Sequence, residues 1–484
     1  MTKKFPSSDK APQSRCRFAI TVADITPPLE IYYRMWGAAK HDRATGVHRP
    51  LRASVAVFAP PHGEDVKSIA QVVVALDHCV MGVVEHRSLV DRVAAMSGVQ
   101  SEQVLVVFSH THGAGLMGLD RVNLPGGEHI PAYLQKLGYT CGRLASDALA
   151  QIRPAWAVYG NGRCSLARYR DYFDAERGEY VVGFTPEHPA DDTLVVARFT
   201  DDSGDLLATL VNYACHPTTL AWENTLISPD FVGAMREVVE RTWKAPCLFL
   251  QGASGELGPR EGFVGNVEVA DRNGRQLGFS ALAALESLPA AGVEFFYKGA
   301  VVSGATLGVW EYRPLGADVV QRLEQWCRDR WEEPLAYRRD LGTAESTAAE
   351  RAALQEKERA ARGQGREQEA ADLRAMVERK TRLLHRLEQL PAGSHFPLQV
   401  VYWRMGDAVW LGVQGEHYSL LQIELRRRFP DRVLVVATIA ADWGASYLPP
   451  REIYGAGIYQ ERIAVVEAGS LELLIESISR RLSS

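Results

Sequence analysis

Short apolar runs that alternate with helix-like stretches are the feature that most restricts the fold of this 484-residue chain. The runs are rich in Val, Leu and aromatic residues, and they occupy residues 53–59, 70–76, 103–109, 207–214 and 245–251. Runs of this length and composition predict buried β-strands. Residues 85–99 and 229–243 carry apolar side chains three and four positions apart, which predicts helices. We therefore expect an α/β fold in which mixed β-sheets are covered by helices.

A compositional change near residue 315 predicts a long helical insertion over residues 315–392. The stretches 316–340 and 345–390 are dense in strong helix formers, chiefly Ala, Glu, Arg, Gln and Leu. We expect a pair of long helices, or a helical hairpin bent near Gly363–Gly365. A solvated insertion is one interpretation. The charge pattern also suits a lid or a coiled-coil contact that makes a homo-oligomer.

Charge and composition exclude several classes of partner. A net charge of −5 and a pI near 6.3 argue against nucleic-acid binding. No run reaches the roughly 20 apolar residues of a membrane-spanning helix. Residues 1–14 are expected to form a flexible polar tail, since the apolar core of a signal peptide is missing. The seven cysteines include no C-x-x-C pair, which is typical of reduced thiols, so we expect a cytoplasmic protein.

Four apolar stretches each lead into residues that bind metals. The run 103–109 continues into His110 and His112, and the run 207–214 continues into His216. Two later strands, expected within residues 398–414 and 432–440, lead to Glu416 and to Asp442 and Tyr447. Open α/β sheets bind ligands outside the carboxyl ends of their strands. If His110 and His112 continue their strand, both side chains point to the same face.

Imidazole, carboxylate and phenolate oxygen are suitable donors for a catalytic zinc, which keeps one position open for water. Other interpretations stay open from the residues alone. His216 precedes Pro217 and could be a turn residue, and Glu416 could serve the first turn of the helix that follows it. Tyr447 could be a packing residue. Trp36, Trp222, Trp443 and Tyr418 are candidates for the lining of an apolar pocket, or for ordinary core residues.

Several motifs, in their order and spacing, resemble the catalytic domain of the neutral/alkaline, non-lysosomal ceramidases. They are VADITPP, TGVHRPLRASVAVF, SHTHGAG, DDTLVVARFTDDSG, NYACHPTTL, ISPDFVG, QGASGELGP, GEHYSLLQIELRRRF and SYLPPREIYGAGIYQE. This resemblance covers most of the chain outside residues 315–392. It implies a zinc amidase that hydrolyses the N-acyl bond of ceramide, with one zinc ion per chain. It also implies a single catalytic domain over residues 15–484.

The resemblance assigns roles to individual residues. Its zinc ligands fall on His110, His216, Glu416 and Tyr447. His112 takes the place of the second histidine beside the metal, and Tyr459 matches the tyrosine that stabilises the oxyanion. Arg168 is matched to an active-site arginine.

The sequence also departs from this family. Gly258 stands where the family has a serine proposed as nucleophile or substrate contact, which favours attack by zinc-activated water. We also expect the protein to lack the family's C-terminal immunoglobulin-like domain and its secretion signal. The substrate expected is therefore a lipid or small molecule with an N-acyl group, and ceramide itself stays open. The alternatives are a zinc esterase or lactonase and a non-catalytic binding protein on the same scaffold.

Overall fold

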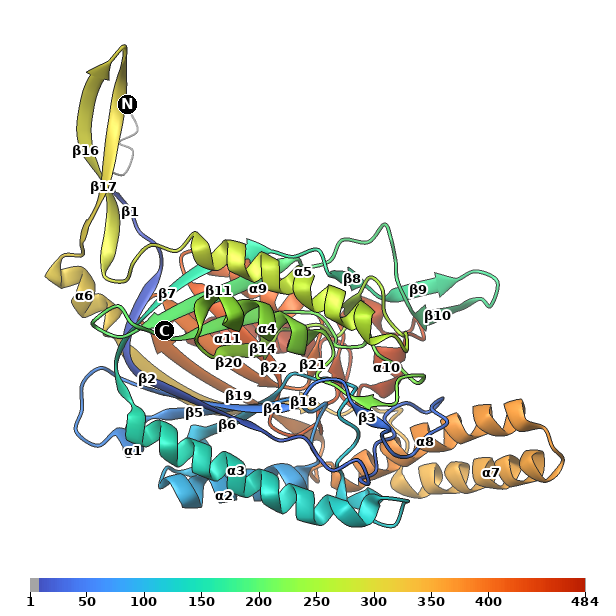
Figure 1. Ribbon diagram of the computed structural model, residues 1–484. Coiled ribbons are helices and arrows are strands. Elements are labelled where there is room, and N and C mark those ends of the chain that lie inside the picture. Colours follow the sequence, from blue (N-terminus) through green and yellow to red (C-terminus); the bar gives the residue numbers. More distant parts are fainter. Residues whose placement is uncertain (1–7, 484) are drawn as a thin grey trace.

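A long, strongly curled β-sheet forms the frame of the protein in the computed structural model, which describes residues 8–483 (Figure 1). Within that range the sheet has twelve strands. In spatial order they are β14 (Cys247–Gln251), β12 (Leu206–Tyr213), β11 (Thr193–Thr200), β7 (Arg153–Arg163), β2 (Gln13–Asp24), β4 (Arg52–Ala59), β5 (Gln71–Leu76), β6 (Val104–Phe108), β22 (Val433–Ala440), β20 (Ala408–Gln414), β19 (His395–Met405) and β18 (Trp326–Ala336). The five strands expected from the first apolar runs are among them, within two or three residues at each end.

The sheet curls so that its two halves, the arms of the sheet, face one another across an apolar interior. Phe18, Phe58, Leu250 and Trp410 belong to this one buried cluster, although they come from strands far apart in the sheet order. Asn212 joins the two arms: its amide nitrogen donates to the carbonyl groups of Leu250 and Val436 at 2.9 and 2.8 Å. A buried amide satisfied in this way fixes the register between the arms.

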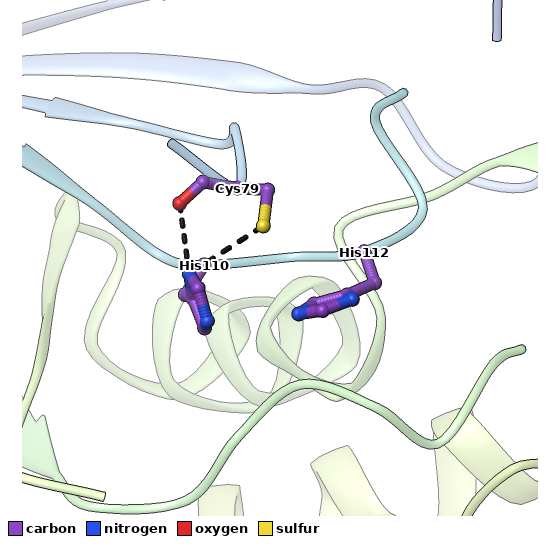
Figure 2. Close-up of side chains that lie close together, drawn as sticks. All are labelled: Cys79, His110 and His112. Carbon is purple, nitrogen blue, oxygen red and sulfur yellow. Dashed lines mark hydrogen bonds between the residues drawn. The ribbon is translucent and has the colours of Figure 1, made fainter. Parts of the chain in front are cut away.

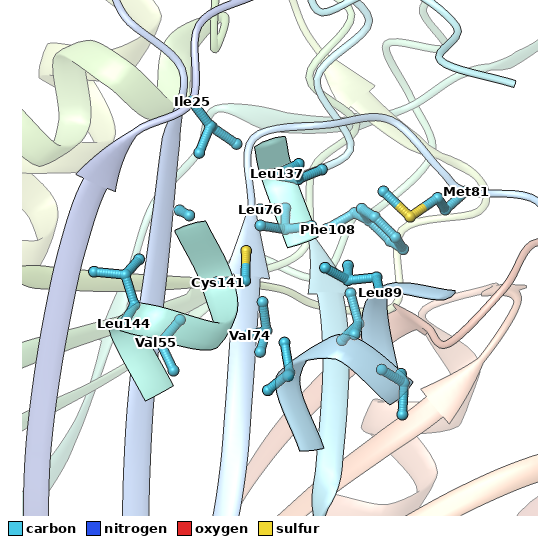
Figure 3. Close-up of a cluster of buried hydrophobic side chains, with 14 of the residues drawn as sticks. Ile25, Val55, Val74, Leu76, Met81, Leu89, Phe108, Leu137, Cys141 and Leu144 are labelled. Atoms are coloured by element: carbon cyan, nitrogen blue, oxygen red, sulfur yellow. The ribbon is translucent and has the colours of Figure 1, made fainter. Parts of the chain in front are cut away.

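Helices cover the outer faces of both arms, so the layers run helix, sheet, sheet, helix. The helices are α1 (Val66–Ile69), α2 (Val83–Ser97), α3 (Ile130–Gln151), α4 (Phe231–Trp243), α5 (Val267–Glu286), α6 (Ala317–Leu323), α7 (Ala344–Gly363), α8 (Glu367–Gln389), α9 (Leu420–Arg428), α10 (Tyr459–Ile463) and α11 (Ser470–Ser483). Figure 3 shows Leu89 of α2 and Leu137, Cys141 and Leu144 of α3 packed on β4 to β6. The helices expected over residues 85–99 and 229–243 are confirmed as α2 and α4, as is the α/β class.

Short strand pairs shape the loops around the frame. They are β3 (Gly46–Val47) with β13 (Leu226–Ile227), β8 (Ala167–Tyr169) with β15 (Leu257–Pro259), β9 (Asp171–Asp174) with β10 (Glu179–Val182), and β21 (Glu416–His417) with β23 (Tyr447–Leu448). A separate β-hairpin, formed by β16 (Val293–Ser303) and β17 (Ala305–Pro314), projects away from the body (Figure 1). None of the helices within residues 8–483 is long and apolar enough to cross a bilayer.

The structure corrects the expected tail over residues 1–14. Ser8–Asp9 (β1) pairs antiparallel with β16, and β2 begins at Gln13, so residues 8–14 are not a free tail. Residues 1–7 lie outside the described range. The polar composition hid this segment because a strand that pairs along one edge needs backbone groups rather than apolar side chains.

The expected helical insertion is half right. Helices α7 and α8 form the predicted hairpin, which turns at Gly363–Gly365. Helix was wrong for residues 326–336, which form β18 along its whole length against β19. Trp331 and Leu335 are buried in the core on this strand, so tertiary packing overrode the helix propensity of the neighbouring charged residues. The helical insertion proper therefore lies between β18 and β19.

Candidate metal centre

Four side chains predicted as metal ligands converge at one point. The Nε2 atoms of His110 and His216 lie 3.3 and 3.2 Å from Oε2 of Glu416. The hydroxyl of Tyr447 lies 3.2 Å from Nε2 of His216. Donors that bind one zinc ion at 2.0–2.2 Å lie about 3 Å from one another. The donor set and its spacing therefore fit a zinc ion.

Both histidines are oriented by a second hydrogen bond. The Nδ1–H of His110 donates to the carbonyl of Cys79 at 2.8 Å (Figure 2). The Nδ1–H of His216 donates to the carbonyl of Ser254 at 2.6 Å. Each bond holds a proton on Nδ1 and leaves Nε2 as the atom that the ring presents to the site, an arrangement common around bound metals. No hydrogen-bond partner within residues 8–483 reaches the buried Nε2 atoms of His110 and His112.

The electrostatics prepare the site for a cation. Burial, and then Arg170, lower the pKa of His216 to about 3, so this imidazole is neutral and free to donate its lone pair. Burial opposes ionisation of Glu416, but His110 and then His216 outweigh it and hold the pKa of that carboxyl well below its usual value. The protein therefore keeps a buried anion where the ligands meet.

The route by which His110 enters the site differs from the expected one. Strand β6 ends at Phe108, and His110 has a φ of 66°, so it does not continue the strand. The rings of His110 and His112 still turn toward the same space, with centroids 5.0 Å apart (Figure 2). A left-handed residue other than glycine is costly and is held here by its buried surroundings. Figure 2 also shows Cys79 beside His110, and its Sγ lies 3.5 Å from Nδ1.

The frame explains why the ligands meet. The ends of β22 and β6 touch through Ala440 and Val107, and β21 and β23 pair Glu416 with Tyr447. Glu416 follows β20 directly, and Tyr447 follows β22 after a loop. Segments separated by hundreds of residues thus end at the same edge, as the sequence predicted from four apolar stretches.

A cavity of about 430 Å³ opens beside the centre. His112 and Tyr459 line it, and the Tyr459 ring lies 5.9 Å from that of Tyr447. Trp36, Trp222 and Trp443 also line it. The fourth aromatic candidate, Tyr418, instead lies in the core and donates to Asp171 at 2.8 Å.

The structure places Arg170, rather than Arg168, at the centre. Arg170 is buried and donates to the Tyr447 hydroxyl at 3.2 Å and to the Gly255 carbonyl at 2.7 Å. Arg168 is paired across to Gly258 in the short ladder of β8 and β15 and does not line the cavity. The arginine two positions on in the same short stretch was the signal that could have found Arg170.

Gly258 is buried beside this arginine, without crowding at its Cα. A Cβ atom at this position would lie 3.6 Å from Cδ of Arg170 and 3.8 Å from the Thr218 hydroxyl, which are ordinary contacts. A side chain would therefore fit, and glycine is not required here by crowding.

The helical hairpin supplies residues that sequence reasoning did not assign to the site. One face of α8 lines the cavity with Ala375, Glu378, Arg379, Arg382, Leu383 and Arg386. Their spacing of three and four places them on one side of the helix. That periodicity was visible in the sequence, but nothing in it indicated that this helix lies over the strand ends.

Comparison with known proteins gives one consistent result. The chain is 28% identical to a neutral ceramidase of Drosophila pseudoobscura pseudoobscura over 243 residues, and 25% identical to neutral ceramidase 1 of Arabidopsis thaliana over 240 residues. Over this part of its length the chain is similar to neutral ceramidases. These alignments cover 46% and 45% of this chain, but only 31% and 28% of the relatives' own length. No protein-family model matches the chain.

The fold points the same way. The crystal structure of the neutral ceramidase from Pseudomonas aeruginosa superposes with a TM-score of 0.65 and covers 97% of this chain and 74% of its own. The sequence identity in that superposition is 17%, so it establishes the shared fold alone. The predicted resemblance is confirmed by sequence and fold together.

Proposed function

We propose that this protein is a zinc-dependent amidohydrolase that cleaves an N-acyl amide bond. The observation that carries the proposal is the convergence of His110, His216, Glu416 and Tyr447 at spacings of 3.2–3.3 Å. The similarity to proteins named neutral ceramidases supports an amide as the bond that is cleaved. When bound, zinc would act as a Lewis acid toward the carbonyl group and would activate water for attack.

The chain's own residues have separable tasks in such a reaction. His112 lines the cavity beside the centre with an unpartnered Nε2, which places it to exchange a proton with the leaving amine. Tyr459, which is 41% exposed and lines the cavity, would donate a hydrogen bond where negative charge develops on the carbonyl oxygen. Arg170 holds the Tyr447 hydroxyl and acts as a positioning residue.

The acyl chain has a matching surface. Trp36 lies 5.0 Å from the His112 ring, and it contacts Trp222 and Phe263 edge to face. Met35 and Leu116 line the cavity nearby. Apolar and aromatic lining with a few polar groups is usual for sites that bind a lipid or other largely apolar small molecule.

Metal analysis tests the proposal first. Protein purified without a metal-affinity tag should contain about one zinc ion per chain, as the single four-donor set requires. His216→Ala should lose most of it, whereas His62→Ala, at an exposed surface position, should keep it. The zinc-loaded protein should release fatty acid from N-acyl amides, and the metal-free protein should not. Wild-type protein that binds no zinc, even on addition, would refute the proposal.

A further inference from the structure

Helix α8 places more arginine side chains at the cavity than the neighbouring carboxylates neutralise. Arg382 pairs with Glu378 at 2.9 Å, and Glu378 also receives Arg121 at 2.8 Å. By contrast, Arg386 and Arg379 form no side-chain hydrogen bond or salt bridge with any residue in the range 8–483. Both line the cavity.

Arg386 is the more constrained of the two. Its side chain is buried, and its Nε has no hydrogen-bond partner among the described residues. The guanidinium lies 4.9 Å from the Trp443 ring centre, and a cation–π contact of this kind leaves the N–H donors free. Arg386 lines the same cavity as Glu416, Tyr447 and Tyr459. Burial lowers the pKa of Arg386, and these three residues oppose that shift.

Burying an unpaired guanidinium costs free energy unless an anion binds to it. Arg386 forms no salt bridge with Glu378 or Glu416. Glu378 already binds two arginines, and Glu416 faces the histidines. The planar fork of arginine matches a carboxylate or a phosphate through two parallel hydrogen bonds. A neutral amide offers no partner of that kind.

From this geometry we infer that the cavity accepts N-acyl substrates with an anionic group close to the scissile amide, and that Arg386 binds this group. Arg379, about two turns away on the same face of α8, adds positive charge to the cavity wall. An N-acyl amino acid is the simplest such substrate, because its carboxylate is one carbon from the amide nitrogen. Hydrolysis would add water across the C–N bond and release a fatty acid and an amino acid. This inference rests on the proposed hydrolase function and narrows its substrate class.

The experiment compares three substrates that differ in one group. N-Lauroylglycine carries a carboxylate, N-lauroylglycinamide is its neutral counterpart, and N-lauroyl-aminoethyl phosphate carries a phosphate. Zinc-loaded wild-type protein should show a kcat/KM for at least one anionic substrate about tenfold or more above that for the neutral amide, as expected for a charged hydrogen bond. The two anionic arms show whether carboxylate or phosphate is preferred.

Substitutions in α8 test which residue causes the preference for anionic substrates. Arg386→Gln should remove the preference, mainly through KM of the anionic substrate, and Arg386→Lys should keep part of it. Arg379→Gln, a second variant in the cavity, should weaken the preference less. Arg374→Gln removes a charge from the same helix outside the cavity lining and should change nothing. Equal loss of kcat on all three substrates would mean that Arg386 serves the oxyanion instead, and would overturn the inference.

Binding without turnover separates this inference from the proposed function. Calorimetry on chelator-treated protein should show tighter binding of N-lauroylglycine than of the glycinamide, with the difference lost in Arg386→Gln. If no amide is hydrolysed but this difference persists, the hydrolase proposal fails and the anion site stands. If the neutral amide binds and reacts as well as the anionic substrates, the anion site is refuted and the hydrolase stands.

Discussion

His112 and its neighbours decide the chemistry at the scale of single residues. Burial, and then His110 and His216, lower the pKa of His112 well below its usual value in the metal-free protein. The ring is thus neutral and can accept a proton before it returns one to a leaving group.

We predict that His112→Ala impairs amides more than activated esters. Loss of a general acid–base group should lower kcat for an amide by about 10²–10⁴, since the amine leaves only when protonated. A p-nitrophenyl ester, whose leaving group needs no proton, should lose about tenfold or less on the same argument. Parallel steady-state kinetics on the two substrates would measure this, and equal losses would exclude this role for His112.

Arg170 should tune metal affinity without being a ligand. Arg170→Lys removes the Nη2 group that donates to both the Tyr447 hydroxyl and the Gly255 carbonyl, so zinc affinity should fall by about 10–100-fold. Arg168→Lys, on the adjoining strand and outside the cavity lining, is the matched control and should keep its affinity. Competition with a chelator of known zinc affinity would measure both. An effect in Arg168→Lys alone would restore the assignment made from the sequence.

At the scale of elements, helix α8 is attached by a buried ionic group. Glu378 accepts from Arg121, in the turn Leu119–Arg121, and from Arg382 on its own helix. Arg382 also donates to the carbonyl of Met35. These contacts hold the cavity-lining face of the hairpin against the body, so the position of Arg386 depends on them.

This attachment should weaken in acid. Burial would raise the pKa of Glu378, but Arg382 and Arg121 lower it to about 2 from 4.5. The carboxylate therefore contributes stability above pH 4.5 that is lost as the pH falls toward 2, amounting to about 3 kcal/mol. Glu378→Gln should cost a similar amount at pH 7 and flatten this part of the pH profile. Glu350→Gln, at an exposed pair with Lys380, should cost under about 1 kcal/mol.

Denaturant unfolding at pH 3, 4, 5 and 7 would measure both variants. An unchanged pH profile in Glu378→Gln would show that other carboxyl groups dominate acid sensitivity. Stability equal to wild type at pH 7 would show that the ion pairs contribute little.

For the whole molecule, the helical hairpin is an addition to a complete sheet. Strands β18 and β19 pair antiparallel up to Ala336 and His395, and the backbone of Tyr337 donates to Ser394. These residues are placed as the two sides of a β-hairpin, so a tight turn could replace the segment between them.

We predict that replacing residues 339–392 by Asn-Gly preserves the sheet and the zinc site. Arg121→Met should accompany the deletion, since Arg121 would otherwise lose Glu378 and keep only Asp120 as an ion-pair partner for a buried charge. Elemental analysis should still find about one zinc ion per chain, because all four ligands lie outside the deletion. Binding of N-lauroylglycine should be lost with the cavity wall. Loss of zinc in a variant with native circular dichroism would show that the hairpin supports the centre itself.

The sequence by itself determined what depends on local pattern. Apolar runs predicted β4, β5, β6, β12 and β14, and helical periodicity predicted α2 and α4, since side-chain direction follows directly from backbone period. Metal-binding residue types near strand ends indicated six candidates, which are His110, His112, His216, Glu416, Asp442 and Tyr447. The resemblance to the neutral ceramidases then selected His110, His216, Glu416 and Tyr447 as the ligands. Strands of one sheet end at a common edge, and polar side chains that follow different strands can meet there.

Only the tertiary structure decided what depends on distant neighbours. It made a strand of residues 326–336, paired residues 8–9 with β16, and chose Arg170 over Arg168. It also laid α8 across the cavity and left Arg386 without a carboxylate partner among residues 8–483. Propensity and spacing describe a segment alone, whereas burial and ion pairing depend on which segments pack against it.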